Sequence, residues 1–242
     1  MDMALFVILG LAIGSFLNVV ILRVPKGESI SFPASHCPKC KKKLKPYHNI
    51  PLLSWIFLRG KCAYCKGQIS LQYPLVELFV SIIFVLAYMK SGDIVQGAIL
   101  GSLFALLLAL SIIDLRYKAV PDLVSMPALF ISFFARDFAD SFKDGLLFAG
   151  GFTLLRMVVS WIIKKEAMGE ADIIIAAIIG ATLGIKLGLS AIYISALIAL
   201  PAFLIVGKKD FHLPFIPFLT LGLFLTWLMD TSILNLISKI YE

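Results

Sequence analysis

Charged side chains are scarce in this sequence. Of its 242 residues only 15% are charged, whereas 60% are hydrophobic and the mean hydropathy is +0.96. Soluble domains typically carry about a quarter charged residues. The composition therefore argues against an ordinary soluble domain and predicts a protein whose main solvent is lipid.

Acidic residues are almost absent from residues 23–73, the one long segment that is not apolar. Glu28 is the only acid there against ten Lys or Arg, and this balance of +9 exceeds the +7 of the whole chain. A basic patch can bind nucleic acid, but beside membrane spans it is more typical of the cytoplasmic side. We therefore expect a cytoplasmic loop and no nucleic-acid partner.

Basic residues are also absent before the first apolar run, residues 3–22, and no small-residue cleavage site follows it. These absences argue against a cleaved signal peptide. The run is long enough to cross a bilayer, and its positive charges follow it, which predicts a spanning helix with its N-terminus outside. Gly10 and Gly14 have the small-xxx-small spacing of closely packed membrane helices. Ser15 and Asn18 are expected to hydrogen-bond to another helix.

Cysteine occurs only in residues 23–73, as the two pairs Cys37–Cys40 and Cys62–Cys65 with 21 residues between them. Two C-x-x-C pairs suit a tetrahedral zinc site, because each pair supplies two of the four thiolates. A reducing cytoplasm disfavours disulfides, and an iron site or free thiols are the alternatives. Four sulfur ligands leave no open position, so the predicted zinc is structural and neither His36 nor His48 is a ligand.

The chain beyond residue 73 is nearly all apolar, and with the first run it offers eight candidate spans. The predicted fold is an all-α polytopic membrane protein of about eight transmembrane helices with a small zinc-stapled cytoplasmic loop. Its organisation would be a first helix at 1–22, the tetracysteine loop at 23–73 and a transmembrane bundle at 74–242. The later spans are expected at 74–90, 94–113, 120–135, 143–163, 172–185, 189–206 and 213–235.

The short connections between these spans carry charge on one side of the membrane. Alternation of the spans places Arg116 and Lys118, Lys164 and Lys165, and Lys208 and Lys209 on the same side as the cysteine loop. The acidic turn 137–140 falls on the opposite side. The positive-inside rule therefore supports the same orientation as the loop does.

Two acids stand at the ends of apolar runs. Asp114 closes the run 94–113 and Asp172 opens the run 172–185, and an unpaired charge within a membrane costs ~2.5 kcal/mol or more. Either acid alone is compatible with a simple helix end in the headgroup zone. Alternation places both at the cytoplasmic edge, and two facing carboxylates would share a proton, so that one activates water while the other protonates a scissile carbonyl. This pair suggests an aspartyl hydrolase, with Asp122 after Pro121 as a helix cap.

Helix ends predict a division of labour between the two acids. Asp114 ends its helix, where the macrodipole disfavours a negative charge, whereas Asp172 begins one, where the macrodipole favours it. Asp172 is therefore expected to be the base and Asp114 the proton carrier.

Several further residues have two interpretations or a packing role. Glu77 is either a buried acid or an acid near the lysines of the loop, and Arg156 is expected to snorkel or to pair with a carboxylate. The spacings 97/101, 180/184 and 184/188 of glycine predict close helix packing.

Together these motifs resemble the type IV prepilin peptidases, bacterial inner-membrane aspartyl proteases of the Gly-x-Gly-Asp group. The likeness runs almost from end to end. It is carried by Gly14-Ser-Phe-Leu-Asn-Val, Arg23-Val-Pro25, Phe32-Pro-Ala-Ser-His-Cys-Pro-Lys-Cys40, Tyr73-Pro-Leu-Val-Glu77, Asp114 with Pro121-Asp122, and Glu166-Ala-Met-Gly-Glu-Ala-Asp172.

The resemblance implies a function. Asp114 and Asp172 would be the catalytic pair of a multi-pass inner-membrane enzyme, with residues 74–242 as its peptidase bundle. The substrate would be a type IV pilin-like precursor, cut on the cytoplasmic side after a glycine between its basic leader and its hydrophobic helix. Family members often also methylate the new N-terminus with S-adenosylmethionine, although no Gly-rich motif in this chain points to that cofactor.

The chain departs from the family pattern at three positions. Ala171 replaces the second glycine of Gly-x-Gly-Asp, so the turn should avoid a conformation that only glycine adopts. Ile174 stands where the family commonly has lysine, and Gln72 where it has arginine. Two other functions are compatible with the composition: a transporter, which should show paired interrupted helices near mid-membrane, and a membrane scaffold that recruits partners through a zinc ribbon.

Overall fold

The computed structural model describes residues 2–165, 168–206 and 214–241, and within these ranges it contains helices and no β-strand. The predicted all-α membrane fold is thus confirmed. The chain divides into two compact units, residues 1–105 and 106–242, which are described one at a time. The helix α4 (Ile94–Tyr117) begins in the first unit and ends in the second.

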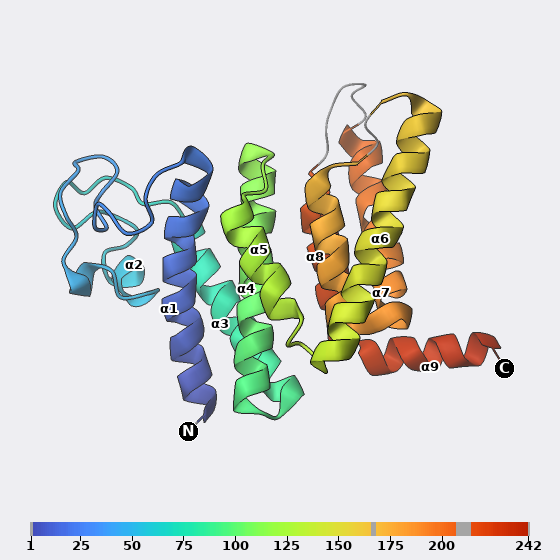
Figure 1. Cartoon of the computed structure of the whole chain (residues 1–242). Helices are drawn as coiled ribbons and strands as arrows, with labels where there is room; N and C mark the ends of the chain where they lie inside the picture. Colours follow the sequence, from blue (N-terminus) through green and yellow to red (C-terminus); the bar gives the residue numbers. More distant parts are fainter. Residues whose placement is uncertain (1, 166–167, 207–213, 242) are drawn as a thin grey trace. The chain divides into compact units, whose positions relative to one another are not determined.

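The first unit is built on a pair of packed helices, α1 (Asp2–Arg23) and α3 (Gln72–Ser91) (Figure 1). A Cβ atom at Gly10 would lie 2.5 Å from Ser81 Cα, and one at Gly14 would lie 2.7 Å from Glu77 Cα. Neither backbone could approach so closely past a side chain, so these two glycines set the separation of the helices. The predicted small-xxx-small contact is confirmed.

A polar side chain of α1 bonds across the same contact. Asn18 Nδ2 donates to the carbonyl oxygen of Tyr73 at 3.1 Å and to that of Gly14 at 3.2 Å. Asn18 therefore acts as the sequence predicted, as a polar link between helices within an apolar setting.

The loop between α1 and α3 has little regular structure. It contains two 3-10 turns, η1 (Val24–Lys26) and η2 (Pro46–His48), and one short helix, α2 (Leu53–Phe57). Isolated bridges pair His36 with Lys43 and Lys61 with Gln68.

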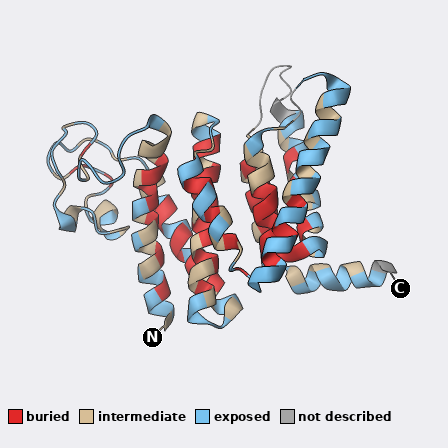
Figure 2. Ribbon diagram, viewed as in Figure 1, coloured by how far each residue is buried: buried red, intermediate tan, exposed pale blue. Residues whose placement is uncertain are grey.

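The second unit is organised around the first half of α7 (Glu170–Val206). Residues 175–182 there are all buried (Figure 2), and a helix buried on every side is the centre of its bundle. It packs against α5 (Asp122–Ser132), α6 (Phe138–Ile163) and α8 (Ile216–Leu228).

The helix α7 is interrupted at Gly184, whose φ of 77° and ψ of −177° are not helical. The ribbon of α7 turns back on itself (Figure 1). One ring, that of Phe148, would lie 2.6 Å from a Cβ at Gly180 and 2.6 Å from a Cβ at Gly188, which a straight helix would separate by ~12 Å. The break at Gly184 falls one residue before the end of the expected span 172–185, and the three glycines are packing sites as predicted.

The expected number of eight spans is not confirmed. Among the described residues five helices are long and apolar enough to cross a membrane, or six if α8 and α9 (Asp230–Tyr241) count as one broken span. Those two meet at 82°, so the predicted span 213–235 is not one straight helix. Residues 207–213, which include Lys208 and Lys209, lie outside the described part of the chain.

The expected span 120–135 is instead the 11-residue helix α5, ~17 Å long at 1.5 Å per residue and shorter than the ~30 Å hydrocarbon core. Pro121 precedes its first residue, and Asp137 already caps α6 through the N–H groups of Ala139 and Asp140. The predicted cap at Asp122 is also wrong, because Asp122 is the first helical residue and no side chain caps α5.

Candidate functional site

The four cysteines form one cluster in the loop of the first unit. Their sulfur atoms all lie within 4.8 Å of one another, and Cys37 Sγ is 3.9 Å from Cys65 Sγ. Zinc bound to four sulfurs at ~2.3 Å holds them ~3.8 Å apart. All four thiols are free of disulfides. The cluster has the ligands and the spacing to bind a metal ion.

Each pair of cysteines lies in the same kind of backbone turn. Cys37 N–H donates to Lys42 O at 3.0 Å and Lys41 N–H to Cys37 O at 2.9 Å; Cys62 N–H donates to Gly67 O at 2.8 Å and Lys66 N–H to Cys62 O at 3.0 Å. Lys41 and Lys66 occupy equivalent positions with φ of 59° and 58°. The two turns present their thiols in matching geometry, a property that the spacing alone did not show.

Backbone polarity acts on these thiols. The N–H groups of Cys65 and Tyr64 lower the pKa of the Cys62 thiol to about 6, which favours the thiolate that a metal requires. At Cys40 the N–H of Lys42 acts in the same sense, but burial and the three neighbouring thiols prevail and raise its pKa to about 11. A central cation would stabilise all four thiolates and reverse that second effect.

Neither histidine of the loop joins this cluster. The ring nitrogen Nδ1 of His36 lies 3.1 Å from Ala34 O, and the ring of His48 packs edge-on against Tyr47 and Tyr64. Among the described residues the potential ligand group consists of the cysteines alone, as the sequence predicted.

The carboxyl group of Asp114 lies near the end of α4, three residues before Tyr117. The residue is only 7% exposed, and its buried Oδ2 atom has no hydrogen-bond partner among the residues that the structure describes. The backbone N–H of Ile216, the first residue of α8, faces this carboxyl group. Helix N-termini favour negative charge, so α8 offsets the dipole of α4 at Asp114.

The carboxyl group of Asp172 lies in the first turn of α7, where the backbone N–H of Gly169 faces it. The charge of Asp114 also acts on Asp172. The second unit thus brings the two acids close enough for the charge of one to act on the other, although 57 residues separate them along the chain. Ile216 was missed from the sequence, although Pro217 in the first turn of an apolar run is a helix-start signal.

The backbone before Asp172 avoids the glycine-only conformation, as Ala171 led us to expect. Glu166 and Ala167 of the motif lie outside the described residues, while Ala171 is helical and has no positive φ. A methyl group at this position is therefore accommodated by an ordinary helical turn, and the expectation for Ala171 is confirmed.

An ion pair that the sequence did not predict supports the break in α7. Arg136 Nη2 donates to Asp144 Oδ2 at 2.8 Å, and Arg136 Nε donates to Ala181 O at 3.2 Å. Asp144 is 5% exposed. The interruption at Gly184 frees carbonyl groups at the end of the first half of α7, and a guanidinium group satisfies such carbonyls and complements the helix dipole.

The remaining candidate residues have structural partners. Arg156 Nη1 lies 3.5 Å from Glu170 Oε1, so it pairs with a carboxylate as one interpretation proposed. Glu77 is 7% exposed and its Oε2 accepts a hydrogen bond of 2.7 Å from Leu52 N–H. Glu77 therefore ties the loop to α3.

Two family descriptions match the chain. Residues 8–91, which contain the four cysteines, match the Bacterial Peptidase A24 N-terminal domain. Residues 101–204, which contain both acids, match the Type IV leader peptidase family. No significant match to a solved structure is found.

Curated relatives give the same result. The chain is 41% identical over 186 residues to a prepilin leader peptidase/N-methyltransferase of Myxococcus xanthus, a match that covers 73% of the chain and 54% of that longer protein, about half of its length. It is 33% identical over 238 residues to a type 4 prepilin-like proteins leader peptide-processing enzyme of Escherichia coli, with 88% of both chains covered. A prepilin leader peptidase/N-methyltransferase of Bacillus subtilis is 32% identical over 98% of both chains. This chain is therefore a member of the type IV leader peptidase family.

Proposed function

We propose that this protein is a membrane aspartyl endopeptidase that removes the leader from type IV pilin-like precursors, with Asp114 and Asp172 as its catalytic pair. The observation that carries the proposal is that these two carboxyl groups each lie near a helix end and that the charge of Asp114 acts on Asp172. Family membership and the printed functions of the relatives support the substrate class.

The two acids would share the work of amide hydrolysis. Asp172 takes a proton from the attacking water, whose oxygen bonds to the scissile carbonyl carbon, while Asp114 gives its proton to the carbonyl oxygen. Within the described part of the chain the Oδ2 atom of Asp114 has no hydrogen-bond partner, so it is available to donate a hydrogen bond to the carbonyl of a substrate that reaches it. Collapse of the tetrahedral intermediate then breaks the C–N bond, as Asp172 gives the proton that it took from water to the leaving nitrogen and Asp114 takes a proton back from the hydroxyl of the intermediate.

We further propose that Cys37, Cys40, Cys62 and Cys65 bind a zinc ion, and that this ion is structural, since four thiolates leave no open coordination position. The relatives named as N-methyltransferases support a second reaction, methylation of the new N-terminus by S-adenosylmethionine. The +9 charge of the cysteine loop supports a cytoplasmic loop, an N-terminus outside and cleavage at the cytoplasmic edge of the inner membrane, with lipid as the surrounding partner.

The experiment is cleavage of a pilin-like precursor by purified protein in detergent or liposomes. We expect Asp114→Asn and Asp172→Asn to lose ~10²–10⁴-fold in rate, since each removes an acid–base group. Asp122→Asn is the matched control, because this exposed acid opens α5 and should retain activity. Metal content should stay unchanged in all three variants. Normal cleavage by Asp114→Asn or Asp172→Asn would refute the assignment of these two acids as the catalytic pair. The transporter and the membrane scaffold would then be the remaining interpretations.

The orientation has a separate test. A thiol introduced as Tyr117→Cys should resist a membrane-impermeant reagent added from the periplasmic side of intact cells. Efficient labelling from that side would contradict the proposed topology.

A further inference from the structure

One stretch of the cysteine loop differs from the rest of it. Residues 46–58 contain no Lys, Arg, Asp or Glu, although ten basic residues lie between positions 23 and 73, and Lys45 and Arg59 flank the stretch directly. We call residues 46–58 the loop tip. A segment without charge between two cations has the pattern of a membrane-inserted rather than a water-exposed loop.

The loop tip displays large apolar side chains to its surroundings. Four of them are 46–82% exposed: Ile50, Leu53, Ile56 and Phe57. Three of these belong to the short helix α2. A contiguous exposed apolar surface of this kind marks a contact with a membrane or a partner.

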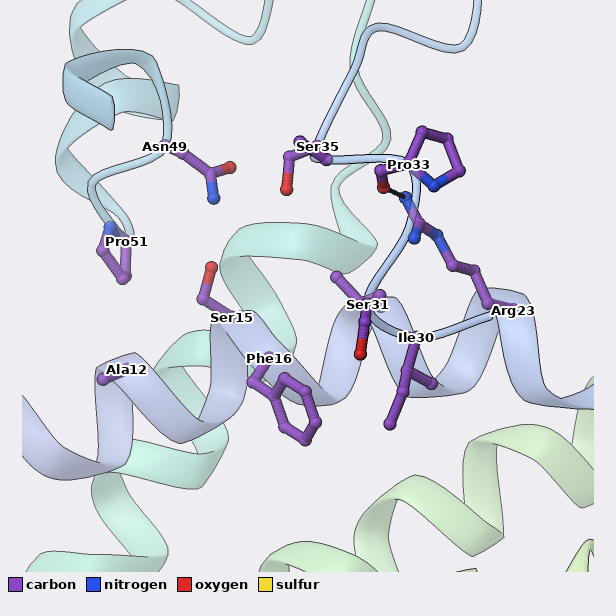
Figure 3. A pocket seen from close by; sticks show the side chains of 12 residues that line it. Ala12, Ser15, Phe16, Arg23, Ile30, Ser31, Pro33, Ser35, Asn49 and Pro51 are labelled. Atoms are coloured by element: carbon purple, nitrogen blue, oxygen red, sulfur yellow. Dashed lines mark hydrogen bonds between the residues drawn. The ribbon is translucent and has the colours of Figure 1, made fainter. Parts of the chain in front are cut away.

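The packing of the loop tip gives its depth. Leu52 N–H donates to Glu77 Oε2 at 2.7 Å, and Glu77 stands five residues inside α3, ~8 Å from the first residue by helical rise. Asn49 and Pro51 line a pocket together with Ala12 and Ser15 of α1 (Figure 3). Ser15 stands eight residues before Arg23, the basic end of α1, which corresponds to ~12 Å.

Both helices that hold the loop tip are long and apolar enough to span the membrane. The ribbon of α2 accordingly lies beside the middle of α1 and not beyond its end (Figure 1). Arg23 marks the headgroup level, because basic residues at the end of a span anchor there. A tip that contacts α1 and α3 roughly 8–12 Å inward by helical rise lies at the depth of the acyl chains.

We propose that residues 46–58 are inserted in the cytoplasmic leaflet, with Ile50, Leu53, Ile56 and Phe57 in contact with lipid acyl chains. The occupant of this apolar surface is lipid because the surface continues the lipid-facing sides of α1 and α3, whose exposed residues include Phe16 and Leu75. The cysteine turns remain in water, where their lysines are solvated. The middle of the loop is thus inserted in the membrane, and the cysteine cluster lies outside the membrane.

The test measures the depth of a single tryptophan. In a full-length background with Trp55, Trp161 and Trp227 replaced by Phe, Phe57→Trp is placed in phosphatidylcholine vesicles with or without brominated acyl chains, which quench nearby indoles. Leu154→Trp on the exposed side of α6 is the lipid-facing control, and Lys43→Trp is the control in water. Ile56→Trp provides a second tip position if the first variant misfolds.

We expect Phe57→Trp and Ile56→Trp to lose at least half as much fluorescence to brominated lipid as Leu154→Trp does. Quenching no greater than that of Lys43→Trp would overturn the proposal. The proposal would also be overturned if brominated lipid did not quench the fluorescence of the tip variants but a precursor's hydrophobic segment shifted it to the blue. The apolar surface of the loop tip would then bind a protein helix.

Discussion

The cysteine cluster and the acid pair are assembled by different means. Each half of the cluster comes from a turn of about six residues whose own backbone hydrogen bonds orient the thiols. The acids come from two helices and are separated by 57 residues along the chain, and only the packing of the second unit brings them together. The cysteine cluster, which is made from local turns, should be lost when one of its own cysteines is replaced. The acid pair, which is made by helix packing, should also be disturbed when a distant packing contact is changed.

The largest expected effect breaks the cluster and spares the acids. Cys37→Ser and Cys62→Ser each remove a buried thiol of the cluster, and we expect bound metal to fall from about one ion per chain to nearly none, because three ligands no longer enclose it. Residues 23–73 should become sensitive to protease while the helices stay inserted, held by lipid and helix packing. Elemental analysis and limited proteolysis measure both.

A zinc content that is already below one ion per freshly purified wild-type chain would contradict the metal assignment. A matched control is His36→Ala, since His36 lies beside Cys37 without belonging to the cluster, and its metal content should not change.

A second prediction distinguishes the two acids. Asp114→Asn keeps a neutral hydrogen-bond donor at the position of the protonated acid, whereas Asp172→Asn removes the base outright. Residual cleavage should therefore be greater in Asp114→Asn, by up to the ~10-fold that about 1.4 kcal/mol of helix-end electrostatics supplies. Single-turnover rates across the working pH range measure the difference. Equal rates, or the reverse order, would show that the N–H of Ile216 at Asp114 outweighs the dipole of α4.

A third prediction compares two ion pairs of the same unit. Arg136–Asp144 and Lys143–Asp140 both have 2.8 Å contacts, but the side chain of Asp144 is 8% exposed and that of Asp140 is 61% exposed. Arg136→Met leaves Asp144 buried and unpaired. Because Arg136 itself is one third exposed, we expect a loss on the order of 1–2 kcal/mol, less than the ~3–5 of a fully buried pair.

Lys143→Met is the matched control, and it should leave the unfolding transition in detergent where it was. Cleavage should weaken in Arg136→Met alone, although Arg136 stands at the far end of the first half of α7 from Asp172. Unchanged activity with lowered stability would confine the ion pair to a purely structural role.

The smallest effect concerns glycine. Gly14→Ala would place its Cβ 2.7 Å from Glu77 Cα, and overpacking of this kind costs ~1–3 kcal/mol. Gly150 of α6 has no atom within 4 Å of the corresponding position, so Gly150→Ala should be neutral or gain up to about 1 kcal/mol. Thermal unfolding of the two variants in the same detergent provides the comparison, and equal melting temperatures would contradict close packing at Gly14.

Sequence reasoning succeeded where a pattern is local. The C-x-x-C spacing, the glycine pairs and the apolar runs each specify their own neighbourhood, and the cluster and the packing of α1 on α3 followed from them. The sequence also singled out Asp114 and Asp172, because a carboxylate at the end of an apolar run is unusual, and their catalytic role stays a prediction.

Sequence reasoning failed where the outcome depends on partners distant in the chain. Hydropathy does not predict that α5 ends at Ser132 or that α8 and α9 meet at 82°. It measures how apolar a segment is and not the direction in which its backbone runs. The Ile216 N–H faces Asp114, and the Arg136 side chain bonds to a carbonyl near the break in α7. The spacing of these residues in the sequence does not predict either interaction.

The glycine at position 184 also has a mechanical consequence. The segment from Asp172 to Gly184 is a stiff rod of ~18 Å, with a proposed catalytic group at one end and, at the other, a pivot held by the guanidinium of Arg136. A tilt of only ~3° about that pivot displaces the far carboxyl group by ~1 Å, and a misplacement of that size can cost ~10²-fold in rate. The backbone at Gly184, at the opposite end of this segment from Asp172, therefore determines how accurately the Asp172 carboxyl group is positioned for the reaction.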